Sequence, residues 1–142
     1  FQGVSKRQDI RLDTDRLILI EDFAHHPTAI KTTIEGIRKN FPTNRLLVAV
    51  ELRSNTMKSG FHDKRLVEAT SDADKIFWKS SDSEQVQGLI NKNPSISFKI
   101  DDVDVFVKNF NSISDEGDIL LVMSNGNFDS LSSKILEITK DE

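Results

Sequence analysis

Three polar segments of the sequence, each directly after a short apolar run, hold most of the side chains that could do chemistry. The segments are 21–27, 53–60 and 124–128, and the apolar runs before them are 17–20, 46–52 and 119–123. They contain carboxylates, two imidazoles, an arginine, a lysine, amides and hydroxyls, and a glycine at a predicted turn into a helix. Cationic side chains and the N–H groups at the start of a helix both attract anions. The three segments together therefore suit a ligand that carries several negative charges.

The elements around these segments alternate between strand and helix patterns. The runs 46–50 and 119–123 are continuously apolar, which is typical of strands buried on both faces of a parallel sheet. Further strands are predicted at 10–12, 17–20, 75–78 and 96–100, and helices at 30–41, 66–70, 86–90, 103–110 and 131–138. This order predicts a three-layer α/β domain with a mostly parallel sheet of about six strands and an antiparallel edge strand near the N-terminus.

Two features of this architecture bear on function. Ligands of open α/β sheets bind beyond the carboxyl ends of the strands, so we expect the three polar segments to lie along one edge of the sheet. The helices should begin at capped positions, and Asp63, Ser83 and Asp102 are the predicted N-cap residues of three of them.

Each candidate residue also has a structural explanation. Asp22 could cap the helix that begins near Pro27, because Asp is favoured before helices. Arg53 and Lys58 could be solvated loop charges, and Gly126 could serve only a tight turn. Against this, a loop of eight residues between a buried strand and a helix is longer than a plain connection needs, and the arginine fork matches a carboxylate.

The histidine pair His25-His26 raises the question of a metal site. Adjacent side chains point in different directions, and no Cys or third His stands at ligand spacing, so we expect no metal ligands here. The sequence also lacks the phosphate-binding motif G-x-x-x-x-G-K-[ST], and no Ser-His-Asp set can be argued from spacing. The domain alone is expected to contain no catalytic residue and not to turn over ATP.

Length and composition exclude several classes of protein. The 142 residues suit one domain, and with a formal net charge of −4 and scattered basic residues we expect no nucleic-acid partner. The apolar runs are too short to span a bilayer, so we expect no membrane partner. The absence of cysteine fits a reducing, cytoplasmic compartment. Because the sequence begins at Phe1 without Met, we expect a piece of a longer chain.

Over essentially its whole length, the chain resembles the C-terminal domain of the Mur ligase family. Members of this family have a domain for the UDP-sugar, a central P-loop ATPase domain and a C-terminal Rossmann-like domain. Residues 1–8 resemble the junction at which the central domain ends, which leaves 9–142 as the C-terminal domain. The resemblance implies that Arg7 reaches the ATP phosphates and that Asp22 binds the nucleotide ribose. It also implies that the pair His25 and His26 lies close to the nucleotide.

Two motifs narrow the resemblance to one branch of the family. His25-His26-Pro27-Thr28 is shared by ligases that act on UDP-N-acetylmuramate, and 53–58 (RSNTMK) and 123–126 (MSNG) resemble the members that attach a tripeptide. The implied substrate-binding residues are Arg53, Ser54, Asn55, Met57, Lys58, Ser124, Asn125 and Gly126. The sequence departs from this branch at Leu52, where Pro is usual, and at Asn127, Asp129 and Ser130, which replace a glycine-rich stretch.

The activity implied by the resemblance is an ATP-dependent amide-forming ligation in peptidoglycan recycling. L-alanyl-γ-D-glutamyl-meso-diaminopimelate is joined to UDP-N-acetylmuramate through an acyl phosphate, with ATP and magnesium held mainly by the central domain. The expected partners are these two substrates and the N-terminal and central domains of the same chain. Two alternatives remain open. One is a UDP-N-acetylmuramate ligase for another amino acid such as L-alanine, and the other is a stand-alone, non-catalytic nucleotide-binding α/β module.

Overall fold

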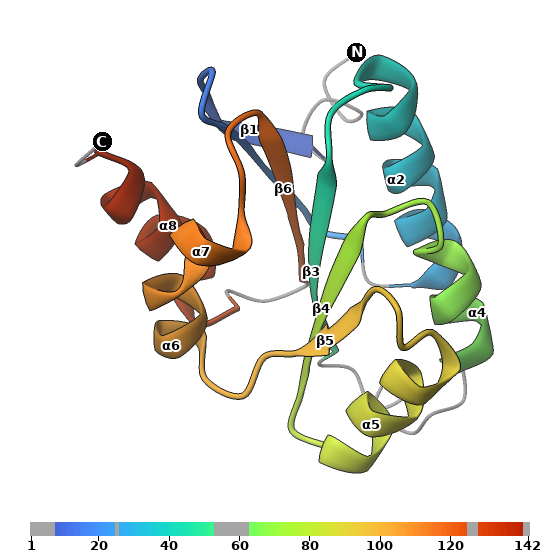
Figure 1. Cartoon of the computed structure of the whole chain (residues 1–142). Coiled ribbons are helices and arrows are strands. Elements are labelled where there is room, and N and C mark those ends of the chain that lie inside the picture. Colours follow the sequence, from blue (N-terminus) through green and yellow to red (C-terminus); the bar gives the residue numbers. More distant parts are fainter. Residues whose placement is uncertain (1–7, 25, 53–62, 125–127, 141–142) are drawn as a thin grey trace.

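Six strands form one sheet in the order β1-β2-β6-β3-β4-β5 (Figure 1). They come from a computed structural model that describes residues 8–24, 26–52, 63–124 and 128–140. The strands are β1 (Gln8–Asp13), β2 (Leu17–Asp22), β3 (Leu46–Leu52), β4 (Lys75–Ser80), β5 (Ser97–Lys99) and β6 (Asp118–Met123). β1 pairs antiparallel with β2 at one edge, and every other pair of neighbours is parallel. The predicted mostly parallel sheet with an antiparallel edge strand is confirmed.

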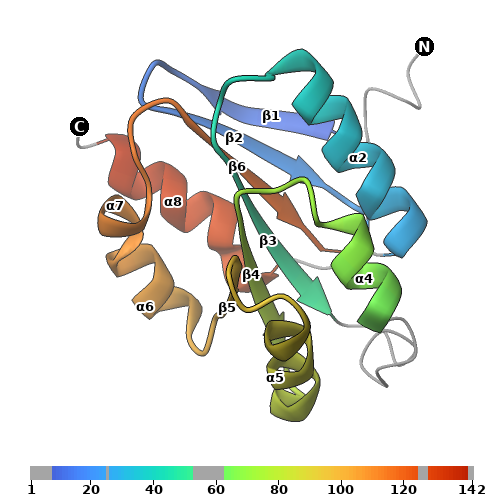
Figure 2. The same cartoon turned by 45° about the vertical axis from the view of Figure 1, so that its right-hand side comes forward.

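Helices cover both faces of the sheet, which confirms the predicted three layers (Figure 2). The helices on one face are α2 (Pro27–Asn40), α4 (Asp63–Ala69) and α5 (Ser83–Lys92). Those on the other face are α6 (Val103–Lys108), α7 (Phe110–Ile113) and α8 (Leu131–Lys140), with the short 3-10 helix η1 (Phe128–Ser130) before α8. Each face has its own apolar core, because side chains alternate between the two sides of a strand. No helix in the described ranges is both long and apolar enough to cross a bilayer.

The two central strands explain the continuous apolar runs of the sequence. Every residue of β3 and of β6 is buried, since both strands lie between two neighbours and beneath helices on both faces. Charged residues occur in these strands only at their ends, as Glu51 in β3 and Asp118 in β6. The charged side chains of these two strands therefore lie near the strand ends.

Two details of the helices differ from the prediction. The apolar stripe at 103–110 predicts one helix, but the structure breaks it at Asn109 into α6 and α7. Asn side chains compete with helical hydrogen bonding, which favours such a break. The N-cap of α5 is Asp82 rather than Ser83, and its carboxylate accepts the two N–H groups of Glu84 and Gln85. Asp102 caps α6 as predicted. Asp63, the third predicted cap, is the first residue of α4, and the residue before it lies outside the described residues.

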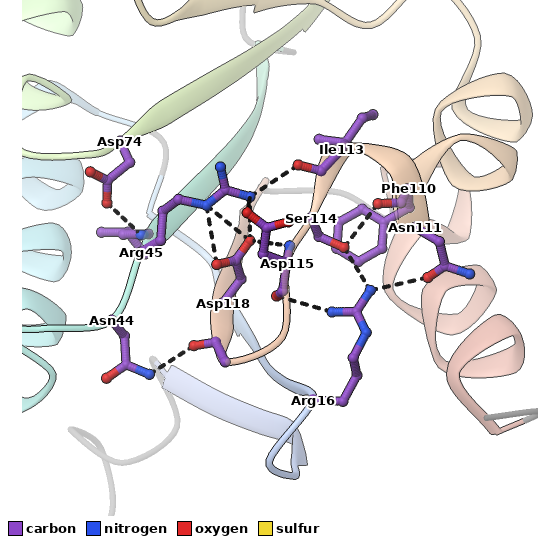
Figure 3. Close-up of polar contacts among 12 residues, drawn as sticks. Arg16, Asn44, Arg45, Asp74, Phe110, Asn111, Ile113, Ser114, Asp115 and Asp118 are labelled. Atoms are coloured by element: carbon purple, nitrogen blue, oxygen red, sulfur yellow. Dashed lines mark hydrogen bonds and ion pairs between the residues drawn. The ribbon is translucent and has the colours of Figure 1, made fainter.

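A charged network fixes the amino ends of the central strands (Figure 3). Arg45, directly before β3, donates three hydrogen bonds of 2.6–3.1 Å to the carboxylate of Asp118, the first residue of β6. The carboxylate also accepts the N–H of Asp115 at 2.7 Å, and 4% of the Asp118 side chain is exposed. The hydrogen bond to Asp118 raises the pKa of Arg45 above its ordinary value, so the guanidinium stays charged. These contacts fix the amino edge of the sheet, which lies opposite the carboxyl edge, where the polar segments begin.

Candidate functional site

Three parallel strands end together at the carboxyl edge of the sheet. β6 lies between β2 and β3, with Met123 in register with Asp22 on one side and with Val50 on the other. The polar segments that follow these strands therefore start side by side, although they are far apart in the sequence. The expected convergence is confirmed for the strand ends and for Ser124. Residues 53–60 and 125–127 lie outside the described residues.

Some of the predicted site residues lie within the described part of the structure and others lie outside it. Asp22, His26 and Ser124 are described. The others lie outside the described residues, and their roles stay predictions: Arg7, His25, Arg53, Ser54, Asn55, Met57, Lys58, Asn125 and Gly126.

Asp22 joins the end of β2 to helix α2. Its side chain is buried, with 4% exposed, and its two carboxylate oxygens accept hydrogen bonds from the Ala24 N–H at 2.8 Å and from the Thr33 hydroxyl at 3.1 Å. The alternative of a helix cap is wrong, because the N-cap residue of α2 is His26. Asp22 thus stabilises the connection between β2 and α2 and does not cap the helix. Its contact with the nucleotide ribose stays a prediction.

His26 stands at the start of α2 with its side chain exposed. Its backbone is extended, at φ −110° and ψ 150°, and its carbonyl accepts the N–H of Ile30 at 2.9 Å. Pro27 follows at the first helical position, where its missing N–H costs nothing and its fixed φ suits the helix. The side chain of His26 therefore lies at the N-terminus of α2, close to the end of β2.

Ser124 connects the ends of all three strands. Its N–H donates to the carbonyl of Asp22 at 3.2 Å, and its hydroxyl donates to the carboxylate of Glu51 at 2.6 Å. Ser124 and Glu51 are buried, with 6% and 7% exposed. Glu51 was not among the residues predicted for the site, because it stands inside the apolar run 46–52. The only signal available was a charged residue in a segment that is otherwise apolar.

A polar cavity of ≈ 470 Å³ opens beyond the ends of β4 and β5. Its lining includes Lys79 on β4, Asp101 and Asp102 after β5, and Ser130 and Lys134 near the start of α8. The lining of the cavity carries charges of both signs. The cavity could not be predicted from the sequence, because its lining residues come from four separate elements. Within the described ranges, no three His, Asp or Glu side chains gather as a possible metal site.

The turn from β6 into α8 has an unusual backbone. Phe128 and Ser130 adopt positive φ values of 49° and 61°, a region that costs a non-glycine residue roughly 1–2 kcal/mol. Ser130 is one of the positions where the sequence departs from a glycine-rich stretch. A serine at this left-handed position therefore stores strain in the turn between β6 and α8.

A mostly parallel sheet covered by helices on both faces defines a three-layer α/β domain of the Rossmann-like class. The chain belongs to the Mur ligase family: residues 6–126 match the model of the family's glutamate ligase domain, described as "Mur ligase, glutamate ligase domain".

Relatives with known names cover nearly the whole chain. It is 31% identical over 143 residues to the UDP-N-acetylmuramate–L-alanyl-γ-D-glutamyl-meso-2,6-diaminoheptanedioate ligase of Haemophilus influenzae, a match that covers 99% of this chain and 32% of the relative. It is 30% identical over 141 residues to the UDP-N-acetylmuramate–L-alanine ligase of Dictyoglomus turgidum, covering 89% of this chain and 30% of the relative. The chain thus spans about a third of the length of the curated relatives it matches.

Solved structures agree with this assignment. A murein peptide ligase from Psychrobacter arcticus superposes with a TM-score of 0.80 at 32% identity, over 94% of this chain and 29% of that one. A crystallised domain from Haemophilus ducreyi, described as coming from a UDP-N-acetylmuramate:L-alanyl-γ-D-glutamyl-diaminopimelate ligase, gives a TM-score of 0.76 at 29% identity. That match covers 92% of this chain and 97% of the crystallised domain, so a related domain of this extent has been crystallised on its own.

Proposed function

We propose that the chain is the C-terminal domain of an ATP-dependent ligase that joins L-alanyl-γ-D-glutamyl-meso-diaminopimelate to UDP-N-acetylmuramate. The observation that carries the proposal is the shared carboxyl edge of β2, β6 and β3, from which all three ligand-binding segments of the resemblance start. The H. influenzae relative, named for this reaction and aligned over 99% of the chain, supports the same substrate.

The reaction has two steps in this proposal. On the central domain, the lactyl carboxylate of UDP-N-acetylmuramate attacks the γ-phosphate of ATP, which yields an acyl phosphate and ADP. The alanyl amine of the tripeptide then attacks the acyl carbon, loses a proton and expels inorganic phosphate, leaving an amide. The C-terminal domain holds the amine in line with the acyl phosphate, and such positioning is worth roughly 7–11 kcal/mol in favourable systems.

The proposed residue roles follow the three segments. Arg53 and Lys58 bind carboxylates of the tripeptide, because charge-assisted contacts to carboxylates are strong. Asp22 with Arg7 contacts the nucleotide as the domain closes on the central domain. Residues 1–8 form the junction between these two domains.

The cofactor and the location follow from the same proposal. In this proposal, magnesium and most of the ATP contacts belong to the central domain. A cytoplasmic location follows, since ATP and the UDP-sugar are cytoplasmic compounds.

A ligase for L-alanine is the second candidate. The D. turgidum relative matches nearly as well, at 30% identity over 89% of the chain. The segment 53–58 favours the tripeptide, because its Arg and Lys provide cations for the extra carboxylates that the tripeptide carries and L-alanine lacks.

An assay of the full-length protein that contains this chain tests the proposal. With ATP and UDP-N-acetylmuramate present, we expect kcat/KM for the tripeptide to exceed that for L-alanine by about 100-fold or more, since a site built for polar groups rejects ligands that lack them. The 142-residue chain alone should release no ADP. Faster turnover of L-alanine would establish the second candidate. No turnover with either substrate, together with nucleotide binding by the isolated chain, would instead favour the stand-alone module.

A further inference from the structure

One buried hydrogen bond joins the starting points of both segments that are predicted to bind the tripeptide. Glu51 stands two positions before Arg53, and Ser124 stands directly before Asn125. The Ser124 hydroxyl lies 2.6 Å from a carboxylate oxygen of Glu51, and both side chains are more than nine-tenths buried. Movement of the end of β3 would therefore also move the end of β6.

The carboxylate of Glu51 is not needed to build the sheet. The other residues of β3 are apolar and buried in the two cores, and an apolar residue at a buried charged position is often neutral or stabilising. Burying a carboxylate costs free energy unless it is well hydrogen-bonded. Sheet stability therefore gives no reason for a glutamate at this position.

The position of Glu51 in the sheet points to the site instead. Glu51 is in register with Lys79 on β4, which lines the polar cavity at the same edge. On its other side, Ser124 continues the register in which Met123 pairs with Val50. The backbone of Ser124 is also tied to Asp22, where the first segment begins. Ser124 and Glu51 thus lie at the centre of the carboxyl edge.

We propose that Glu51 is a positioning residue for the peptide substrate: by accepting the hydroxyl hydrogen bond of Ser124, it fixes the ends of β3 and β6 and holds Ser124, a predicted substrate-binding residue, in place for the tripeptide. The inference rests on the proposed function, because it assigns a task to the peptide-binding part of that site. Glu51 acts through Ser124 and does not itself bind the substrate.

Kinetics of the full-length protein with four single variants test this proposal. Ser124→Ala removes the donor, and Glu51→Asp keeps the charge but shortens the side chain, so both should raise KM for the tripeptide by about 10- to 100-fold. KM for ATP and for UDP-N-acetylmuramate should stay unchanged. Glu51→Gln keeps the acceptor oxygen at the same length and should stay within about threefold of the wild type. Ser132→Ala is the matched control, because Ser132 is a buried serine in α8 whose hydroxyl has no hydrogen-bond partner in the described part of the chain.

The double variant Glu51→Asp/Ser124→Ala separates positioning from direct contact. If Glu51 acts through Ser124, the second substitution adds little to the KM of the first, since the two residues form one unit. Additive effects, a large rise in KM with Ser124→Ala but none with Glu51→Asp, or a Glu51→Gln variant whose KM rises as much as that of Glu51→Asp would overturn the inference. A parallel rise of all three KM values with a fall in Tm would also overturn it, because the effect would then be general destabilisation.

Three further outcomes keep the test decisive. If Ser124→Ala does not fold, the comparison of Glu51→Asp with Glu51→Gln carries the same decision. Wild-type protein that fails to use the tripeptide would overturn both the proposed function and this inference. Wild-type turnover with an unchanged KM in every variant would overturn the inference alone.

Discussion

Replacing Asp118 with alanine is expected to lower the free energy of unfolding of the domain by about 3 kcal/mol, the largest loss of stability we predict for a single side chain. The substitution leaves the Arg45 guanidinium without its principal partner and the Asp115 N–H without its acceptor. Asp118 is nearly fully buried, whereas 29% of the Arg45 side chain is exposed, so we expect a loss at the lower end of the range for broken buried pairs. Thermal unfolding of the isolated domain should show a fall in Tm of roughly 10 °C.

The matched control for this prediction is a second aspartate on the same arginine. Asp115 lies 3.3 Å from Arg45, but 78% of its side chain is exposed. Exposed ion pairs contribute about 0–1 kcal/mol, so Asp115→Ala should change Tm by only a few degrees. Equal falls in Tm from the two substitutions would show that the contribution of Asp118 to stability does not depend on its burial.

Replacing Arg53 with alanine in the full-length protein is expected to raise KM for the tripeptide by about 10- to 100-fold, with a small effect on kcat. The estimate corresponds to the loss of a charge-assisted contact worth about 1.5–3 kcal/mol. Because the contact is proposed to bind the peptide equally in the ground state and in the transition state, its loss should appear in KM. Steady-state kinetics with varied tripeptide, at saturating ATP and UDP-N-acetylmuramate, measures the effect.

The control for Arg53 is another arginine that lies outside the three segments. Arg11 on β1 forms a surface ion pair with Glu21 at 2.7 Å, and 38% of its side chain is exposed. Arg11→Ala should leave KM for the tripeptide unchanged. An Arg53→Ala variant with wild-type KM would remove that residue from the proposed site.

The strands and most of the helices could be predicted because burial leaves a clear pattern in the sequence. A strand covered on both faces must be apolar throughout, which identified β3 and β6. Helix α2 shows its buried stripe at Ile30, Ile34 and Ile37. The break at Asn109 was missed because the apolar stripe runs across it, and the break depends on the backbone angles of one residue, which periodicity does not report.

The convergence of β2, β6 and β3 at one edge of the sheet was predicted, but the contacts at that edge were not. The rule that ligands bind beyond the carboxyl ends of parallel strands needs only the order of elements. The bond between Glu51 and Ser124 joins residues that are 73 positions apart, and it depends on the register of β3 with β6. The cavity around Lys79 likewise needs β4, β5 and α8 in their places. Residue types alone do not determine such registers.

Hydrogen–deuterium exchange of the full-length protein, with and without the tripeptide in the presence of a non-hydrolysable ATP analogue, tests the central claim most directly. We predict slower exchange in 21–27, 51–60 and 124–130, and no change in 42–45 and 114–118 at the opposite edge of the sheet. Protection confined to the opposite edge, or no protection anywhere in this domain, would contradict a peptide-binding site at the carboxyl edge.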